Sequence, residues 1–118
     1  MLMQTARGSS TNALALSVPT GAPRAGVMIH WIATGWTNPA AGVPTEAYVT
    51  VNIAGVNVVV AAKANRSTVS VRDGLTIRFP GPHGLIAGDK ISQEPLLLLQ
   101  FNGTAPTTSD MTIGYSFY

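Results

Sequence analysis

Residues 46–63 read EAYVTVNIAGVNVVVAAK and predict a β-hairpin. Residues 48–53 are rich in Val, Ile, Thr and Tyr, the side chains that favour strands. Residues 56–62 form a second such run, and only Ala54 and Gly55 separate the two. A two-residue connection with glycine is typical of a tight turn between antiparallel strands. We therefore expect an antiparallel sheet in this part of the chain.

The same pattern extends in both directions, because eight prolines and twelve glycines divide the chain into short apolar runs. Residues 72–74 predict a tight turn, and no window shows an apolar stripe at helical spacing. The chain is predicted to be all-β: a single antiparallel β-sandwich or jelly roll of about eight strands over residues 11–118, preceded by a flexible N-terminal arm at residues 1–10. Further strands are expected at 11–18, 25–34, 67–71, 75–79, 95–101 and 111–118.

The composition points to buried contacts with partners. Of the 118 residues, 46% are hydrophobic and only 10% are charged, whereas soluble domains average about 25% charged residues. Such a surface is suited to permanent interfaces. The net charge is +2. The basic residues Lys63, Arg66, Arg72 and Arg78 are too widely spaced for a nucleic-acid stripe, so no nucleic-acid partner is expected.

The stretch PHGLIAGDKIS, residues 82–92, has the residue types of an active-site loop. A phosphate cradle requires a helix N-terminus, and no helix is predicted after Gly88. His83 and Asp89 have no evident activated nucleophile beside them. With His30 they form the only candidate metal-ligand set in the sequence, and three such residues are the minimum for a metal site. The stretch is better interpreted as a turn at Gly88 and Asp89, and no enzyme activity, cofactor or metal is expected.

Cysteine is absent, which excludes disulfides and thiolate chemistry. The start MLMQTARGSS lacks the apolar run of a signal peptide, and no stretch approaches the length of a membrane helix. We therefore expect synthesis in the cytoplasm and no membrane partner.

The stretches GLTIRF, GLIAGDKIS and MTIGYSFY resemble small β-sandwich proteins of phage particles, the head decoration (cement) proteins and related minor virion proteins. The closing residues are also similar to trimeric jelly rolls of the tumour-necrosis-factor and C1q type. The resemblance implies a homotrimer on the capsid surface, bound to the major capsid protein of a phage head. The matching residues are Gly74, Leu75, Ile77, Leu85, Ala87, Gly88, Asp89, Ile91, Ile113, Gly114 and Tyr115.

Interface candidates follow from this interpretation. The N-terminal arm is expected to contact a neighbouring subunit through its apolar residues and its arginine. Trp36 is expected at an exposed loop tip, whereas Trp31 is expected in the core. In residues 95–101, either Leu96 and Leu98 or Leu97 and Leu99 would line a threefold contact. The alternative is a receptor- or carbohydrate-binding module of a tail fibre, with Trp36 and Tyr48 exposed. The interface candidates are Met1, Leu2, Met3, Arg7, Trp36, Leu96, Leu98, Tyr115, Phe117 and Tyr118.

Overall fold

The computed structural model describes residues 4–10, 13–17, 27–53, 56–79, 85–88 and 96–117. These residues are all-β, as predicted. They contain nine strands: β1 (Gln4–Ser10), β2 (Leu14–Ser17), β3 (Val27–Thr37), β4 (Pro44–Ile53), β5 (Val56–Ala64), β6 (Arg72–Arg78), β7 (Leu85–Gly88), β8 (Leu96–Gly103) and β9 (Thr108–Phe117). No helix long and apolar enough to cross a membrane occurs in these ranges.

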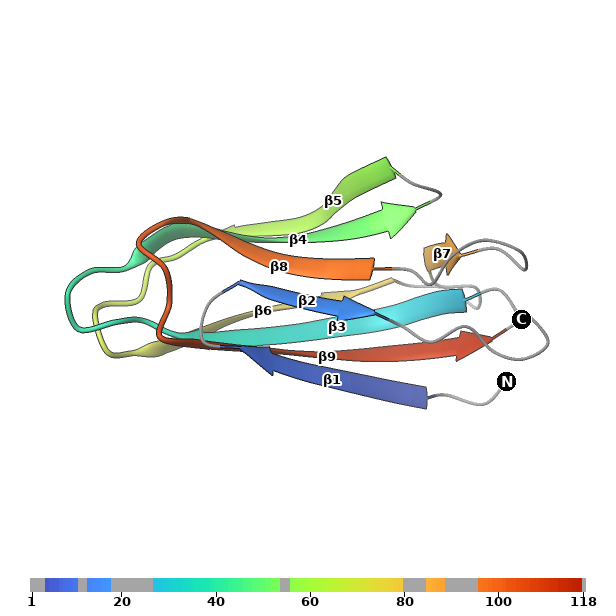
Figure 1. Ribbon diagram of the computed structural model, residues 1–118, viewed down its shortest axis with the longest axis horizontal. Helices are drawn as coiled ribbons and strands as arrows, with labels where there is room; N and C mark the ends of the chain where they lie inside the picture. The colour runs from blue at the N-terminus through green and yellow to red at the C-terminus, as the bar shows by residue number, and fades with distance from the viewer. Residues whose placement is uncertain are drawn as a thin grey trace.

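The strands form two antiparallel sheets that pack face to face (Figure 1). Sheet A has the order β1-β9-β3-β6, with β7 also paired to β3, and sheet B has the order β2-β8-β4-β5. Most connections cross from one sheet to the other, while β4 and β5 form the hairpin predicted from residues 46–63. This order, with β6 and β7 together filling the place beside β3, is that of a jelly roll.

The core lies between the two sheets and is built by alternation along the central strands. Leu97 and Leu99 of β8 point inward and are fully buried, as are Val49 and Val51 of β4. Successive side chains of a strand point to opposite faces, so Leu96 and Leu98 point outward. The core cluster comprises Leu14, Val27, Ile29, Ile32, Val49, Val51, Leu97, Leu99, Met111, Ile113 and Tyr115.

A β-bulge at His30 changes which side of β3 faces the core. The pairing of β3 with β9 shifts between Ile29 and Trp31, so His30 is the extra residue. Ile29 and Ile32 are both fully buried, and Trp31 is turned to the outer face of sheet A. The predicted placement of Trp31 on the core face with Ile29 was therefore wrong, because a bulge inverts the alternation beyond it.

The predicted flexible arm at residues 1–10 is also corrected. Residues 4–10 form β1, which pairs with β9 from Gln4↔Tyr115 to Ser10↔Ser109; residues 1–3 lie outside the described residues. The strand QTARGSS has no apolar alternation to reveal it. It is held by backbone pairing, and Gly8 leaves room for Leu14 and Leu16 of β2, whose Cδ1 atoms lie 3.4 Å from the position of an added Cβ.

Residues 67–74 differ from the prediction as well. The expected strand at 67–71 is a loop with a turn, in which Ser70 has φ 62°. The expected turn at residues 72–74 is instead the start of β6, where Asp73 pairs with Trp36 and Gly74 with Gly35. The short apolar run was over-interpreted, because Val69 and Val71 are in fact exposed at 45% each.

Candidate interaction surfaces

The outer face of sheet B is uncharged over most of its described area. The register places Leu98 between Ala15 of β2 and Thr50 of β4, and Val59 of β5 beyond Thr50. Leu96 and Leu98 are half-buried there, so their side chains are available for a contact. Glu46, near the start of β4, is the one charged side chain among the described residues of this face. We use the term "sheet B face" for Tyr48, Asn52, Leu96 and Leu98, which are partly exposed there.

The edge of sheet B carries three of the exposed valines of the described chain, and two of them are the most exposed. Strand β5 pairs with β4 on one side, and no other described strand of sheet B pairs with it on the other. Val56 is 62% exposed, Val58 41% and Val59 57%. Residues 56–62 carry no charge. Natural edge strands are usually protected by charges, prolines or bulges. Strand β5 has a bulge at Val60, where its pairing with β4 shifts, but its exposed valines have no charge or proline among them, so this segment is suited to being covered by a partner.

The exposed valines lie on both faces of β5. Val58 is opposite Val51, a fully buried core residue, and therefore points to the inner side of sheet B. Val59 is opposite Thr50 and points to the outer side. Figure 1 shows the adjoining ends of β4 and β5 raised away from sheet A, which explains why an inward-pointing valine remains accessible.

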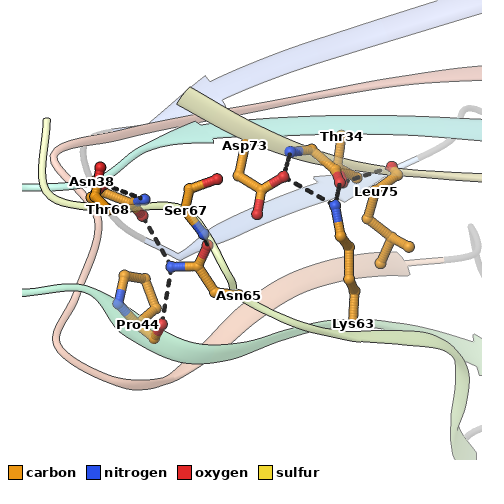
Figure 2. A network of polar contacts seen from close by, with 10 residues as sticks. Thr34, Asn38, Pro44, Lys63, Asn65, Ser67, Thr68, Asp73 and Leu75 are labelled. Atoms are coloured by element: carbon orange, nitrogen blue, oxygen red, sulfur yellow. Dashed lines mark hydrogen bonds and ion pairs between the residues drawn. The ribbon is translucent and has the colours of Figure 1, made fainter. Parts of the chain in front are cut away.

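The other end of β5 is fastened to sheet A by polar contacts (Figure 2). Lys63 Nζ donates to Asp73 Oδ1 and to the Gly74 carbonyl, both at 2.8 Å. Asn65 Nδ2 donates to the Pro44 carbonyl at 2.8 Å and to Asn38 Oδ1 at 3.1 Å. These contacts join β5 and the loop after it to the two sheets, so they have a structural role.

The charge of Asp73 is stabilised by this arrangement. Burial alone would raise the pKa of the Asp73 carboxyl, but the hydrogen bonds from Lys63 and from the Gly74 N–H, with the Lys63 charge, outweigh it. The net effect is a pKa below the ordinary value of 3.8. Lys63 and Asp73 therefore hold each other within the fold, and the Lys63 charge is not available to an anionic partner.

The outer face of sheet A holds a half-buried aromatic ring. The Trp31 indole lies across β9 at Gly114, where an added Cβ would overlap its five-membered ring. Trp31, Ala33, Thr76 and Arg78 line an open hollow of about 320 Å³ beside this ring. We call this feature the "Trp31 hollow". Its volume is at the lower end of the range of small-molecule sites, about 300–1,000 Å³.

A second flat side chain lies farther along the same face. The Arg72 guanidinium lies over Gly35, where an added Cβ would overlap it, and its Nη2 donates to Asp110 Oδ2 at 2.5 Å. Along β3 the outward positions are Trp31, Ala33 and Gly35 in turn. The small Ala33 therefore lies between two large covering groups, which explains why the face is hollowed there.

Several predicted interface residues are not available on this surface. Trp36 is fully buried and packs edge-to-face on Phe101, with ring centroids 5.4 Å apart. Its predicted exposure at a loop tip was wrong, because it lies inside β3 on the core face after the bulge. Tyr115 is 5% exposed and contacts the half-buried Phe117, so both contribute to the core and their predicted interface role is not supported.

The remaining predicted residues have mixed outcomes. Arg7 is exposed on the outer face of sheet A, opposite Thr112. Met1, Leu2, Met3 and Tyr118 lie outside the described residues, as do His83 and Asp89 of the candidate loop. His30 Nε2 lies 2.7 Å from Ser116 Oγ. The described ranges contain no group of three or more side chains that could hold a metal ion.

These observations define the class of the protein as a jelly-roll β-sandwich with two accessible outer faces and with exposed valines on the edge strand β5. No family model matches the chain, and no curated protein matches it. Among solved structures, the chain is similar to a protein described under the words "Bacillus endospore appendages form a novel family of disulfide-linked pili". The sequence identity is 14% and the TM-score 0.40, over 99% of this chain and 88% of the other. We attach no functional inference to this similarity.

Proposed function

We propose that this protein is a structural subunit that acts by self-association, and that it is a virion protein, namely a decoration protein that stabilises an assembled phage head. The observation that supports self-association is the open β5 edge, where Val56, Val58 and Val59 are exposed within the uncharged segment 56–62 of the strand. Full burial of a valine side chain stabilises an interface by about 1.5 kcal/mol or more. Burial of these three side chains against a neighbouring subunit would therefore stabilise the contact.

The sheet B face supplies the complementary surface. In a closed ring of identical subunits, one patch of each copy meets a different patch of the next. We propose a homotrimer in which the β5 edge of one copy packs on the sheet B face of its neighbour, against Leu96 and Leu98. Both surfaces are almost free of charge, so no unpaired charge would be buried by this contact.

The self-association is tested by the native mass from light scattering. The Val59→Lys variant places a charge in the edge, and Val69→Lys is the matched control, because Val69 is an exposed valine of the loop at 65–71. We expect a trimer for the wild type and the control, and a monomer with unchanged circular dichroism for Val59→Lys. A wild-type monomer at micromolar concentration contradicts the proposal.

The virion role is supported by the resemblance of residues 25–118 to phage decoration proteins and by the low charge content. It is tested by quantitative mass spectrometry of virus particles purified from the source of the sequence. We expect the chain at a fixed ratio to the major capsid protein. A trimer that is absent from the particles would leave self-association standing and would refute the decoration role.

A further inference from the structure

We propose that the Trp31 hollow is a binding site for an acidic sugar, a pyranose ring that carries a carboxylate. The site lies on the outer face of sheet A, whereas the proposed subunit contacts use sheet B. Sugar binding is therefore a second function that does not depend on self-association. It would equip the protein to attach to an acidic polysaccharide while the opposite sheet holds its neighbours.

The Trp31 ring supplies the platform. One face of the indole rests on β9 at Gly114, so the ring lies against the backbone of the sheet there. Trp31 is half-buried, so part of its side chain remains accessible to a ligand. Its neighbour in sequence, Ile32, points into the core and is fully buried. The face of an aromatic ring is electron-rich and attracts the weakly positive C–H groups on one side of a pyranose.

The surroundings of the ring match the rest of a sugar. Ala33 forms the floor, and Thr76 stands on β6 beside it, with Thr112 in the same row on β9. The Thr76 side chain is exposed and makes no hydrogen bond within the described residues. A threonine hydroxyl donates and accepts hydrogen bonds, as do the hydroxyl groups of a sugar.

The charge of the site favours an acid. Arg78 lines the hollow, is exposed and forms no ion pair within the described chain. Arg7 lies on the same face, in the row of Thr112 and Ala33, and is likewise unpaired in those ranges. Asp110, the described carboxylate of this face, is already bound to Arg72. A free guanidinium binds a carboxylate with two parallel hydrogen bonds.

A single-stranded nucleic acid fits these observations less well. Such ligands are held by successive aromatic platforms along a continuous basic groove. The described outer face of sheet A presents the Trp31 ring in one small hollow, with two free arginines near it. The site is therefore matched to one anionic ring with hydroxyl groups.

The test is a titration of the full-length protein with a galacturonic acid oligosaccharide, followed by tryptophan fluorescence and calorimetry. Trp31 is the more accessible of the two tryptophans, because Trp36 is fully buried. We expect saturable binding that the Trp31→Ala variant abolishes and that Arg78→Gln weakens about tenfold or more, since a charged hydrogen bond is lost. Arg66→Gln is the matched control, because Arg66 is an exposed arginine of the loop at 65–71; it should bind as the wild type does.

Two further ligands determine whether the site recognises an acidic sugar. A neutral galactose oligosaccharide of the same length should bind at least tenfold more weakly, and an oligothymidylate should not compete. Equal binding of the neutral sugar, or competition by the oligothymidylate, would overturn the proposal, as would no binding of the acidic sugar by the wild type. Circular dichroism of each variant excludes misfolding as the cause of a loss, and Trp31→Phe, which retains an aromatic face, should keep part of the affinity.

Discussion

The indole ring of Trp31 occupies the space that a side chain at residue 114 would need. The two residues are directly opposite each other in the pairing of β3 with β9. A glycine on the partner strand thus allows a large aromatic ring to lie flat on the outside of sheet A. This relationship makes the residue at position 114 a determinant of how Trp31 is presented.

Substitution of Gly114 should displace the Trp31 ring without removing it. In Gly114→Ala the new Cβ would overlap the indole, which must turn away from the sheet towards solvent. We expect a red-shifted tryptophan emission, stronger acrylamide quenching and a loss of about 1–3 kcal/mol in the free energy of unfolding. Emission spectra and an acrylamide titration of the folded protein measure the first two quantities, and denaturant unfolding with fluorescence detection measures the third. An unchanged emission maximum would show that the ring does not rest on Gly114.

The Lys63–Asp73 pair should make stability depend on pH in the acid range. The pKa of the folded Asp73 carboxyl is below its ordinary value of 3.8. The pair's contribution is therefore complete above the unfolded pKa and is lost as pH falls through the folded pKa. Lys63 is 41% exposed along its side chain, so solvent screening limits the contribution to about 1 kcal/mol.

The measurement for this pair is the melting temperature of wild type and Asp73→Asn between pH 2 and pH 7. We expect the wild type to be more stable at neutral pH and the difference to shrink below about pH 4. A Lys63→Met variant and the double variant complete a mutant cycle that isolates the interaction. A difference that stays constant with pH would contradict the assignment of the effect to the carboxylate.

Trp36 should be essential for stability through its volume and not through its N–H group. The side chain is fully buried against Phe101, and its Nε1 has no hydrogen-bond partner within the described chain. Trp36→Ala should cost about 3–5 kcal/mol because it leaves a cavity. Trp36→Phe should cost much less, because it also removes a buried donor without an acceptor. Urea unfolding of the two variants measures both losses in the free energy of unfolding. A loss for Trp36→Phe as large as that for Trp36→Ala would contradict the prediction.

Asn65 should hold the loop at residues 65–71 in place. Its side chain donates to the Pro44 carbonyl and to Asn38, and it accepts from the Ser67 N–H at 3.3 Å. Asn65→Ala removes these contacts and should destabilise the loop by about 1–3 kcal/mol. Hydrogen exchange of the Ser70 N–H, which bonds to the Asn38 carbonyl at 3.1 Å, should become faster. Asn57→Ala is the matched control in the exposed part of β5, and it should leave that exchange rate unchanged.

The strand content and much of the core followed from local pattern. Alternation in PLLLLQF correctly offers Leu97 and Leu99 as one face and Leu96 and Leu98 as the other, and the run at 46–63 correctly predicts the β4–β5 hairpin. None of these inferences requires knowledge of distant residues, because each depends on the two-residue period of a strand.

The remaining features depend on contacts between residues that are far apart in the sequence. No residue near Gln4–Ser10 marks that segment as a strand, since its stability comes from backbone pairing with β9, about a hundred positions along the chain. The presence of Gly114 beneath Trp31 is likewise visible only when β3 and β9 are paired.

The two tryptophans show the division most clearly. Local pattern predicts an all-β chain in which successive side chains of each strand point to opposite faces. On that pattern alone, Trp31 is expected in the core and Trp36 outside it. Only the tertiary structure decided the reverse, with Trp36 in the core and Trp31 on the outer face of sheet A. The physical reason is the bulge at His30. One extra residue, accommodated by the pairing of β3 with its neighbours, inverts every side chain that follows.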